Sequence, residues 1–301
     1  METEIIGNSV NVDGRKRFLV AVLTLNDELQ IEACLKSAAG LDADFLVVDS
    51  GSTDSTVAKA KELGATVLHY PYVTEARTRN WIIDSWASKY EWLVFLDYDE
   101  RLTPELRDEI ASLPPPHRGP KGYKMRRRMF FLGKELRFGG HQDVWLLHVL
   151  HPPAARVVEQ TRTLEYVHVR GPVGKLHHPL IHDNRKGLSA WTRKHVFYAR
   201  REAEDRLARR RRDQDVSENR IKAFIHERIL SHVPPFFTPV LFFCYRYFFR
   251  FGFLDGKVGL IYYLLHDFWY PLLIAAKMFE LQTGHKKRSR RQDTTLAVEG
   301  N

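Results

Sequence analysis

DFLVVDSGSTDSTVAKAKELGATVLHY, residues 44–70, contains a complete strand–helix–strand unit. Its first part, DFLVVD, is a short unbroken apolar run, which is typical of a strand buried on both faces. TVAKAKELG predicts a helix that ends at Gly64, the residue type that most often closes a helix. ATVLHY then predicts the next strand. Because parallel strands need a crossover of this kind, the stretch favours an α/β fold.

The same alternation extends to both sides of this unit. FLVAVLTL at residues 18–25 and EWLVFLD at 91–97 are further buried strands. Residues 26–38 and 75–88 have the composition of helices. The fold class that we predict is therefore α/β, with a mostly parallel sheet, helices on both faces and a ligand site at the carboxyl ends of the strands.

Charge and composition restrict the partners. The chain has 301 residues, of which 44% are hydrophobic, and this content is sufficient for a hydrophobic core. Its net charge of +9 favours an anionic partner. The arginine runs 126–128 and 209–212 lack an accompanying RNA- or DNA-binding motif, so we expect an anionic membrane surface as the partner and no nucleic acid.

Cys34 and Cys244 have no metal-site spacing and predict free thiols. The polar N-terminus lacks a signal sequence, which predicts a cytoplasmic location.

Two apolar stretches lie in the last third of the chain, at residues 236–249 and 258–279. A helix over the second would be roughly 33 Å long, enough to cross a membrane. Its centre contains His266 and Asp267, and a charge there is costly in lipid. We therefore expect peripheral or re-entrant membrane embedding through residues 234–283, with core helices of a soluble protein as the alternative.

Carboxylates follow three of the predicted strands. The first strand ends in the run Thr24, Leu25, Asn26 and Asp27; the second ends at Asp49, with Asp54 shortly after it; the fourth ends at Asp97 and Asp99. Because parallel strands end at one edge of a sheet, these groups are expected to meet in one crevice. Structural explanations also exist: Asp54 as a helix N-cap, Asp27 at a helix N-terminus and Glu100 as a solvated turn residue.

Asp97 and Asp99 are separated by one residue. Alternate side chains of an extended segment point the same way, so both carboxylates are expected to face one point. Two such charges repel unless a cation lies between them. Hard oxygen ligands select Mg²⁺ or Mn²⁺, and these ions also bind substrate phosphates. The pair therefore predicts a divalent metal site.

Four motifs occur in order: TLNDE (24–28), VVDSGSTDST (47–56), Arg79–Asn80 and LDYDE (96–100). Together they resemble the signature of glycosyltransferase family 2 enzymes with the GT-A fold. The stretches YKMRRRMFFLGKELRFGGHQD (123–143) and LEYVHVRGPVGKLHHPLIHD (164–183) also look like the subgroup of lipopolysaccharide-core β-glucosyltransferases and capsule or exopolysaccharide transferases.

The resemblance implies roles for individual residues. Asp97 and Asp99 would be the DxD pair, with Asp99 directly on Mg²⁺ or Mn²⁺, and Asp143 would be the general base. His182 is expected to contact metal or phosphate, and Arg185 and Lys186 to contact the diphosphate unless they are only a solvated start to the next helix. The expected donor-binding residues are Thr24, Asn26, Asp27, Asp49, Asp54, Arg79 and Asp97.

The predicted function is an inverting, metal-dependent glycosyltransferase on the cytoplasmic face of the inner membrane. Its donor would be a nucleotide sugar, with UDP-sugar preferred, and its acceptor a lipid-linked or cell-surface polysaccharide or lipopolysaccharide. A polyprenyl-phosphate monosaccharide transferase and a non-catalytic, membrane-associated nucleotide-binding protein remain as alternatives. An NAD-dependent oxidoreductase is disfavoured, because no GxGxxG follows the first strand.

This interpretation divides the chain into four regions. Residues 1–16 would form a polar leader and residues 17–185 the GT-A nucleotide-sugar-binding catalytic domain. A basic and aromatic helical region associated with the membrane would cover residues 186–283. A basic disordered tail would occupy residues 284–301.

Overall fold

The computed structural model describes residues 16–159, 165–212 and 236–283. The described residues fall into two compact units. The first contains 16–137, 141–159 and 165–185, and the second contains 138–140, 186–212 and 236–283. The predicted tail, and the predicted leader apart from its last residue, lie outside the described residues.

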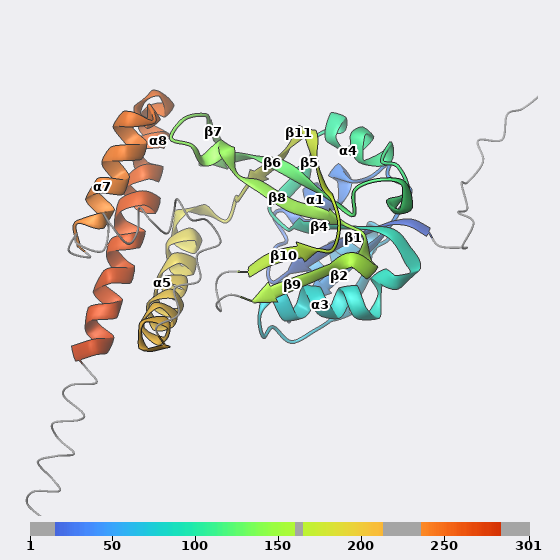
Figure 1. The fold of residues 1–301 in the computed structure, drawn as a ribbon, viewed down its shortest axis with the longest axis horizontal. Coiled ribbons are helices and arrows are strands. Elements are labelled where there is room, and N and C mark those ends of the chain that lie inside the picture. Colours follow the sequence, from blue (N-terminus) through green and yellow to red (C-terminus); the bar gives the residue numbers. More distant parts are fainter. Residues whose placement is uncertain (1–15, 160–164, 213–235, 284–301) are drawn as a thin grey trace, which may run out of the picture. The chain divides into compact units, whose positions relative to one another are not determined.

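A mixed sheet forms the centre of the first unit (Figure 1). Its strands have the order β3-β2-β1-β4-β8-β6-β11-β5, and β7 pairs with β6. The strands are β1 (Lys16–Thr24), β2 (Ala43–Asp49), β3 (Thr66–His69), β4 (Tyr90–Asp97), β5 (Glu100–Leu102), β6 (Gly122–Phe131), β7 (Lys134–Leu136), β8 (Trp145–Leu150) and β11 (Val173–Asp183). A separate two-stranded sheet contains β9 (Ala155–Glu159) and β10 (Glu165–Val169).

Strand directions bring several chain segments to one edge of this sheet. β1 to β4 are parallel, and Thr24 lies opposite Asp49 while Leu23 lies opposite Asp97. β8 runs antiparallel to β4, so its first residues lie at the edge where β4 ends. β6 is antiparallel to β8 and parallel to β11, so β11 also ends there. The sheet thus collects polar residues from distant parts of the chain.

Helices cover both faces of the sheet, as Figure 1 shows for α3 and α4. α1 (Ile31–Ser37), α2 (Thr56–Glu62) and α4 (Pro104–Ala111) pack on the face that includes Val20 and Val94. α3 (Glu75–Ser85) packs with β9 and β10 on the face that includes Leu19 and Phe95. Since neighbouring residues of one strand are buried on opposite faces, the continuous apolar runs are explained. The predicted α/β class is confirmed, and the strands beyond β4 make the sheet mixed.

Two predicted helices are shorter than expected. The helix expected at 26–38 begins only at Ile31, because Asn26 has a φ of 55° and the amides of Gln30 and Ile31 both donate to the Asp27 carbonyl in a turn. The helix expected at 75–88 ends at Ser85 and is followed by a 3₁₀ turn at Ala87–Lys89. The early turn after β1 matters for the site, since it places residues 24–27 at the sheet edge.

The second unit is helical. Its elements are α5 (Gly187–Arg212), α7 (Thr238–Cys244), the π-helical turn η6 (Tyr245–Phe249), the 3₁₀ turn η7 (Gly252–Asp255), α8 (Gly256–Tyr263), the π-helical turn η8 (Leu264–Trp269) and a helix over 270–283. Helical residues run without a break through Gly252–Thr283, which is long enough and apolar enough to cross a membrane by length and composition. This long apolar helix confirms the predicted helical character of the region.

The charged residue at the centre of this apolar stretch, Asp267, faces the inside of the second unit. Asp267 is 5% exposed, lies 2.9 Å from His266 Nδ1 and pairs with Arg246 at 3.7 Å. The outward side chains are apolar: Phe237, Leu241, Phe248, Phe249, Phe251, Leu254, Leu264 and Phe279 are all at least two-fifths exposed. The charge that makes a simple membrane span costly is therefore shielded by protein, while the apolar groups remain available for lipid.

Candidate active site

Asp27 holds the loop that follows β1. Its side chain is 1% exposed, and Oδ2 accepts hydrogen bonds from the Thr24 hydroxyl and from the amide of Leu25, both at 2.8 Å. The amide of Asp27 donates to the Thr56 hydroxyl at 2.7 Å. Asp27 therefore ties the end of β1 to the start of α2. Thr24 and Asp27 are at the predicted edge, and both serve the shape of the loop.

The loop after β2 is built on Asp49. This carboxylate is 4% exposed, and its Oδ2 accepts from the amides of Gly51 and Ser52 at 2.9 Å. Asn26 faces the same loop: its amide donates to the Ser52 hydroxyl, and its Oδ1 accepts from the amide of Thr53, both at 2.8 Å. Asn26 is exposed, so a part of this predicted pocket is open to a ligand.

Asp54 stands just before α2. Its Oδ1 accepts from the amide of Thr56 at 3.0 Å, and its Oδ2 accepts from the amide of Glu28 at 3.2 Å. Ser55 is the N-cap of α2, so Asp54 lies one residue before the N-cap position that was considered for it, although its carboxylate still satisfies a backbone donor in the first turn. Its role in donor binding stays a prediction.

Arg79 and Asp97 form an ion pair between α3 and the end of β4. The Arg79 side chain is 8% exposed, its NH2 donates to Asp97 Oδ1 at 2.9 Å, and its guanidinium lies 5.2 Å from the Phe95 ring centroid. Asp97 is more open, with 39% of its side chain exposed. The buried arginine fixes one oxygen of this carboxylate and leaves the group accessible at the sheet edge.

The residues after β4 form a turn, so the extended geometry assumed for Asp97 and Asp99 is wrong. Tyr98 and Asp99 lie in this turn, and β5 begins at Glu100. Asp99 is 5% exposed while Asp97 is open, so the two carboxylates have different surroundings. Glu100 is 0% exposed, and its Oε2 accepts from the amide of Asp97 at 3.0 Å. The interpretation of Glu100 as a solvated residue is therefore also wrong.

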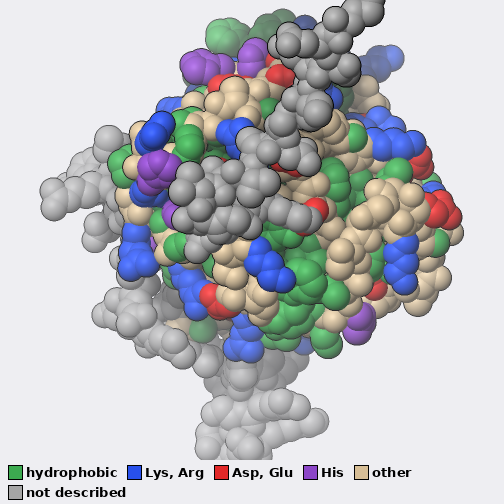
Figure 2. Space-filling view, turned by 90° about the vertical axis from the view of Figure 1, so that its right-hand side faces the viewer, with side chains coloured by type: hydrophobic (Ala, Val, Ile, Leu, Met, Phe, Trp, Pro, Cys, Tyr) green, Lys and Arg blue, Asp and Glu red, His purple; other side chains and the backbone are tan. Residues whose placement is uncertain are grey.

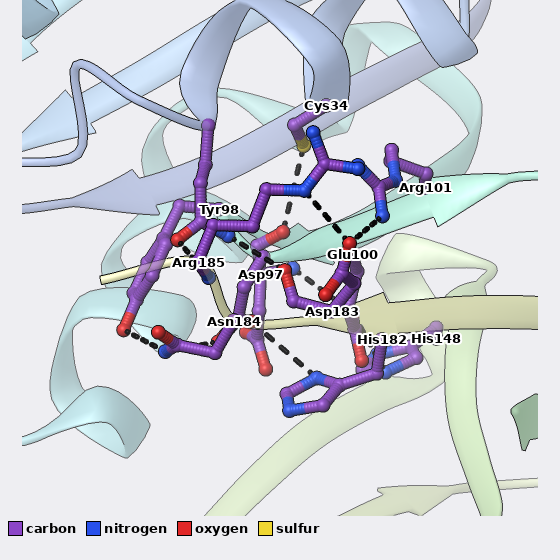
Figure 3. Close-up of polar contacts among 12 residues, drawn as sticks. Cys34, Asp97, Tyr98, Glu100, Arg101, His148, His182, Asp183, Asn184 and Arg185 are labelled. Carbon is purple, nitrogen blue, oxygen red and sulfur yellow. Dashed lines mark hydrogen bonds and ion pairs between the residues drawn. The ribbon is translucent and has the colours of Figure 1, made fainter. Parts of the chain in front are cut away.

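Asp99 faces the end of β11, where it contacts His182 and Asn184. Both of these residues are labelled in the close-up in Figure 3. Asn184 donates to Asp99 Oδ2 at 2.9 Å, and His182 Nδ1 lies 3.4 Å from Asp99 Oδ1. Polar protein groups thus contact each carboxylate. Arg79 contacts Asp97, and Asn184 and His182 contact Asp99. The repulsion between the two aspartates alone does not require a metal ion.

The donor set at Asp99 nevertheless fits a small divalent cation. His182 Nδ1 is buried and has no hydrogen-bond partner within the described part of the chain, although it points at a carboxylate oxygen. A carboxylate oxygen and an imidazole nitrogen side by side are ligands that Mg²⁺ or, more readily, Mn²⁺ accepts. Asp99 and His182 are therefore the residues that could hold the ion.

The carboxylate of Asp183, the residue after His182, binds two arginines. Its Oδ2 accepts from Arg101 at 2.6 Å and from Arg185 at 2.8 Å. Burial raises the pKa of Asp183, but the hydrogen bonds from these arginines outweigh it and leave the pKa below its ordinary value. Gln30 supports the same segment, since its amide nitrogen donates to the Asp183 carbonyl at 2.9 Å and its oxygen accepts from the amide of Arg185 at 3.0 Å.

Replacing Arg101 by methionine is expected to lower the free energy of unfolding by about 1–3 kcal/mol at neutral pH, because a buried carboxylate loses a charged donor. The pKa of Asp183 is lower in the folded than in the unfolded state. The arginine's stabilisation is thus complete above the unfolded pKa and disappears as pH falls through the folded one. Urea denaturation at neutral and acidic pH measures both effects.

The matched control is Arg107→Met. Arg107 pairs with Asp108, whose side chain is 69% exposed, so this change should cost less than about 1 kcal/mol. Equal stability of the Arg101 variant and the unmodified protein at neutral pH would show that Asp183 does not need its arginine.

The sequence did not single out two buried residues of this region, His148 and Gln30, and it placed a third, Glu100, in solvent. His148 and Glu100 are 4% and 0% exposed and lie 3.4 Å apart, between β8 and β5, and Gln30 is 4% exposed. These polar residues are buried by tertiary contacts, and a single sequence contains no signal for such burial. Cys34 is buried nearby; burial and the neighbouring carboxylates raise the pKa of its thiol, so it stays neutral.

Asp143 and the basic residues lie in different settings. Asp143 is exposed in a 3₁₀ turn at His141–Asp143, directly before β8. Because β8 starts at the edge where β4 ends, this turn lies at the edge that carries Asp97.

Arg185 is within the first unit and is bonded to Asp183, whereas Lys186 belongs to the second unit. The roles of these three residues stay predictions.

Residues 19–112 match the family model described as Glycosyl transferase family 2. This match covers less than half of the chain. The matched region, here called the family 2 domain, includes the strand ends from Thr24 to Asp99, and over it the predicted similarity to family 2 glycosyltransferases is confirmed. The subgroup of lipopolysaccharide-core or capsule transferases stays a prediction.

Curated relatives match over part of their length. An uncharacterized glycosyltransferase of Rickettsia bellii is 34% identical over 98 residues, which cover 33% of this chain and 33% of the relative. A second, of Rickettsia typhi, is 28% identical over 122 residues, covering 40% of this chain and 41% of the relative. The chain thus matches between about a third and two-fifths of the length of these relatives.

Two solved structures are similar to the chain over different lengths. Staphylococcus aureus TarS 1–349 in complex with UDP-GlcNAc is 15% identical, with a TM-score of 0.47, over 89% of this chain and 92% of that one. Glucosyl-3-phosphoglycerate synthase from Mycobacterium tuberculosis with Mn²⁺, UDP-glucose and phosphoglyceric acid is 26% identical, with a TM-score of 0.32, over 38% and 45%.

Proposed function

We propose that the family 2 domain transfers a hexose from a nucleoside-diphosphate sugar, preferably a UDP-sugar, to a hydroxyl group of a lipid-linked or cell-surface polysaccharide or lipopolysaccharide. One observation carries the proposal. The open Asn26, the Arg79–Asp97 pair and the Asp99–His182 contact come from separate segments of the first unit to one sheet edge. Such an edge is the usual ligand site of an open α/β sheet.

The donor would be bound by a fixed framework with few open groups. Asp27, Asp49 and Asp54 are occupied with backbone donors and keep the two loops in shape. Asn26 and Asp97 are open and are suited to hydrogen bonding with the base or ribose. Arg79 holds Asp97 in place and brings positive charge near the expected phosphates.

Asp99 and His182 would hold Mg²⁺ or Mn²⁺ beside the diphosphate. The ion, when bound, would neutralise the charge that develops on the departing nucleoside diphosphate. Asn184 orients Asp99 through its hydrogen bond, so the carboxylate keeps one oxygen directed at His182. Arg185 is exposed and could add a second positive group, although it is also engaged with Asp183.

Asp143 would act as the general base. Its exposed carboxylate is accessible to an acceptor and lies at the sheet edge described above. It would take the proton of the acceptor hydroxyl while that oxygen attacks the anomeric carbon and the bond to the diphosphate breaks. A single displacement of this kind inverts the configuration of the sugar.

The second unit would bring the enzyme to the cytoplasmic face of the inner membrane. Its exposed phenylalanines and leucines lie beside Arg246, Arg250 and Lys257, a composition suited to an anionic leaflet. A membrane location favours a lipid-linked acceptor. The product distinguishes this proposal from a polyprenyl-phosphate transferase, whose organic-phase product would contain one sugar only.

The test of the reaction uses the full chain purified in detergent. Thermal shifts with a panel of nucleotide sugars, each with and without Mn²⁺, identify the donor, and radiolabelled donor with membrane lipid extracts tests transfer. We expect a stabilising shift with one nucleotide class that is larger with Mn²⁺. No shift and no transfer with any nucleotide sugar would contradict the proposed function.

Membrane binding has a separate test. The double variant Phe237→Ser and Phe249→Ser removes side chains that are 63% and 74% exposed, and each buried aromatic contributes about 1.5–3 kcal/mol. Flotation with vesicles that contain anionic lipid should therefore fall at least about tenfold. Leu29→Ser in the first unit, at a position 65% exposed, is the control and should leave binding unchanged. Equal flotation of the double variant would exclude these residues as the anchor.

A further inference from the structure

Residues 138–140, which precede Asp143, make their backbone hydrogen bonds with the C-terminal helices of the same unit. The amide of Gly139 donates to the Arg250 carbonyl at 2.9 Å, and Arg246 NH1 donates to the Gly139 carbonyl at 3.0 Å. The amide of Phe138 donates to Asp255 Oδ2 at 3.2 Å. Each of these contacts fixes main-chain atoms, so they determine the path of the segment and not only its side chains.

Tyr263 and Asp255 form the buried centre of this arrangement. Tyr263 is 0% exposed and Asp255 is 2% exposed. The Tyr263 hydroxyl lies 2.9 Å from the Phe138 carbonyl oxygen and 2.7 Å from Asp255 Oδ2. Burying these polar groups is costly unless they are hydrogen-bonded, so their mutual contacts define one specific arrangement.

Three glycines allow this close approach. Gly139 has a φ of +68°, and a Cβ there would lie 2.4 Å from the Tyr263 hydroxyl oxygen. A Cβ at Gly252 would meet the Tyr263 ring at 2.8 Å, and one at Gly259 would lie 2.3 Å from the Asp255 Cβ. Since no side chain fits at these positions, the contact between the segment and the helices is a built feature of the fold.

The chain around Arg250, whose carbonyl binds the amide of Gly139, also presents apolar side chains to the outside of the second unit. Phe249, Phe251 and Leu254 are 74%, 57% and 53% exposed, and they directly precede Arg250, Gly252 and Asp255 in the chain. The part of the chain that we expect to enter lipid is therefore the part that binds residues 138–140.

We propose that Arg246, Asp255 and Tyr263 form a clasp that positions the turn carrying Asp143, so that this carboxylate takes the proton of the acceptor hydroxyl. Only two residues separate Gly140 from Asp143, so the clasp fixes the point from which the turn departs. The inference rests on the proposed function, because it assumes that Asp143 is the base. Asp255 and Tyr263 are positioning residues: they act on the backbone and touch no substrate.

Tyr263→Phe tests the clasp by removing one hydroxyl group. We expect kcat for transfer to fall roughly 10- to 100-fold, because a displacement of a catalytic group by about 1 Å has effects of this size. The KM for the donor should stay unchanged. Tyr247→Phe is the matched control, since its ring packs 5.9 Å from that of Tyr263 and should leave kcat unaltered. Unchanged kcat in the Tyr263 variant would overturn the proposal.

A double-mutant cycle with Asp143→Asn separates positioning from a general loss of stability. If the clasp acts through Asp143, Tyr263→Phe should have almost no further effect on kcat in the Asp143→Asn background. An equal loss in both backgrounds would overturn the positioning role.

Hydrogen exchange gives a measurement that does not depend on activity. In the Tyr263→Phe protein the amide of Gly139 and its neighbours should exchange faster than in the unmodified protein and in Tyr247→Phe. Unchanged exchange would show that no clasp holds this segment. Faster exchange in a protein without transferase activity towards any donor would leave the clasp in place and refute only the proposed function.

Discussion

Replacing Asp99 by asparagine is expected to lower kcat/KM for sugar transfer by roughly 10³-fold, the size of effect found when charge stabilisation of a leaving group is removed. Asparagine has nearly the same volume, so the buried turn between β4 and β5 should remain folded. Asp99 is 5% exposed and lies 3.4 Å from His182, and its loss would leave the imidazole as the only remaining member of this ligand pair.

Two measurements accompany the rate. The affinity for Mn²⁺ in the presence of nucleoside diphosphate, measured by calorimetry, should fall together with the activity in Asp99→Asn and in His182→Gln. Asp108→Asn is the control, because that carboxylate is 69% exposed and lies on α4. Full activity and unchanged Mn²⁺ affinity without the Asp99 carboxylate would refute its metal role.

Asp143→Asn is expected to have the second large effect. A general base contributes about 10²–10⁴-fold to a rate, and asparagine cannot accept the proton of the acceptor hydroxyl. kcat should therefore fall within this range while the dissociation constant of the donor stays the same. Because Asp143 is exposed in a short turn, the substitution should not disturb the fold.

Donor binding provides the check on this role, because it should be the same in Asp143→Asn and in the unmodified protein while the transfer rate falls. Donor hydrolysis and calorimetric donor binding serve as controls for an intact donor site. An unchanged transfer rate would exclude Asp143 as the base and direct the search to other carboxylates at this edge.

The sequence predicted the elements that depend on local pattern. The apolar runs at 18–25, 44–49 and 91–97 each correspond to a strand, because strands buried on both faces need continuous apolar residues. The location of Asp49 and Asp97 at strand ends followed directly. The family match over residues 19–112 includes these same strand ends.

Local pattern did not predict the environment of individual carboxylates. Asp97 and Asp99 were expected to face one point, yet a turn of two residues leaves Asp97 open beside Arg79 and buries Asp99 against Asn184. Glu100 was expected in solvent and is fully buried near His148. Burial depends on β5, β8 and β11 coming together, and these strands are far apart in the chain.

The sequence by itself determined the α/β class, the carboxylates at the strand ends and the apolar character of the C-terminal helices, because each depends on the spacing of residues close together in the chain. Only the tertiary structure decided which side chain meets which carboxylate: Arg79 with Asp97, His182 with Asp99, and Arg101 and Arg185 with Asp183. The physical reason is that an ion pair requires approach within a few ångströms, and that distance is set by sheet order and register across many residues of intervening chain.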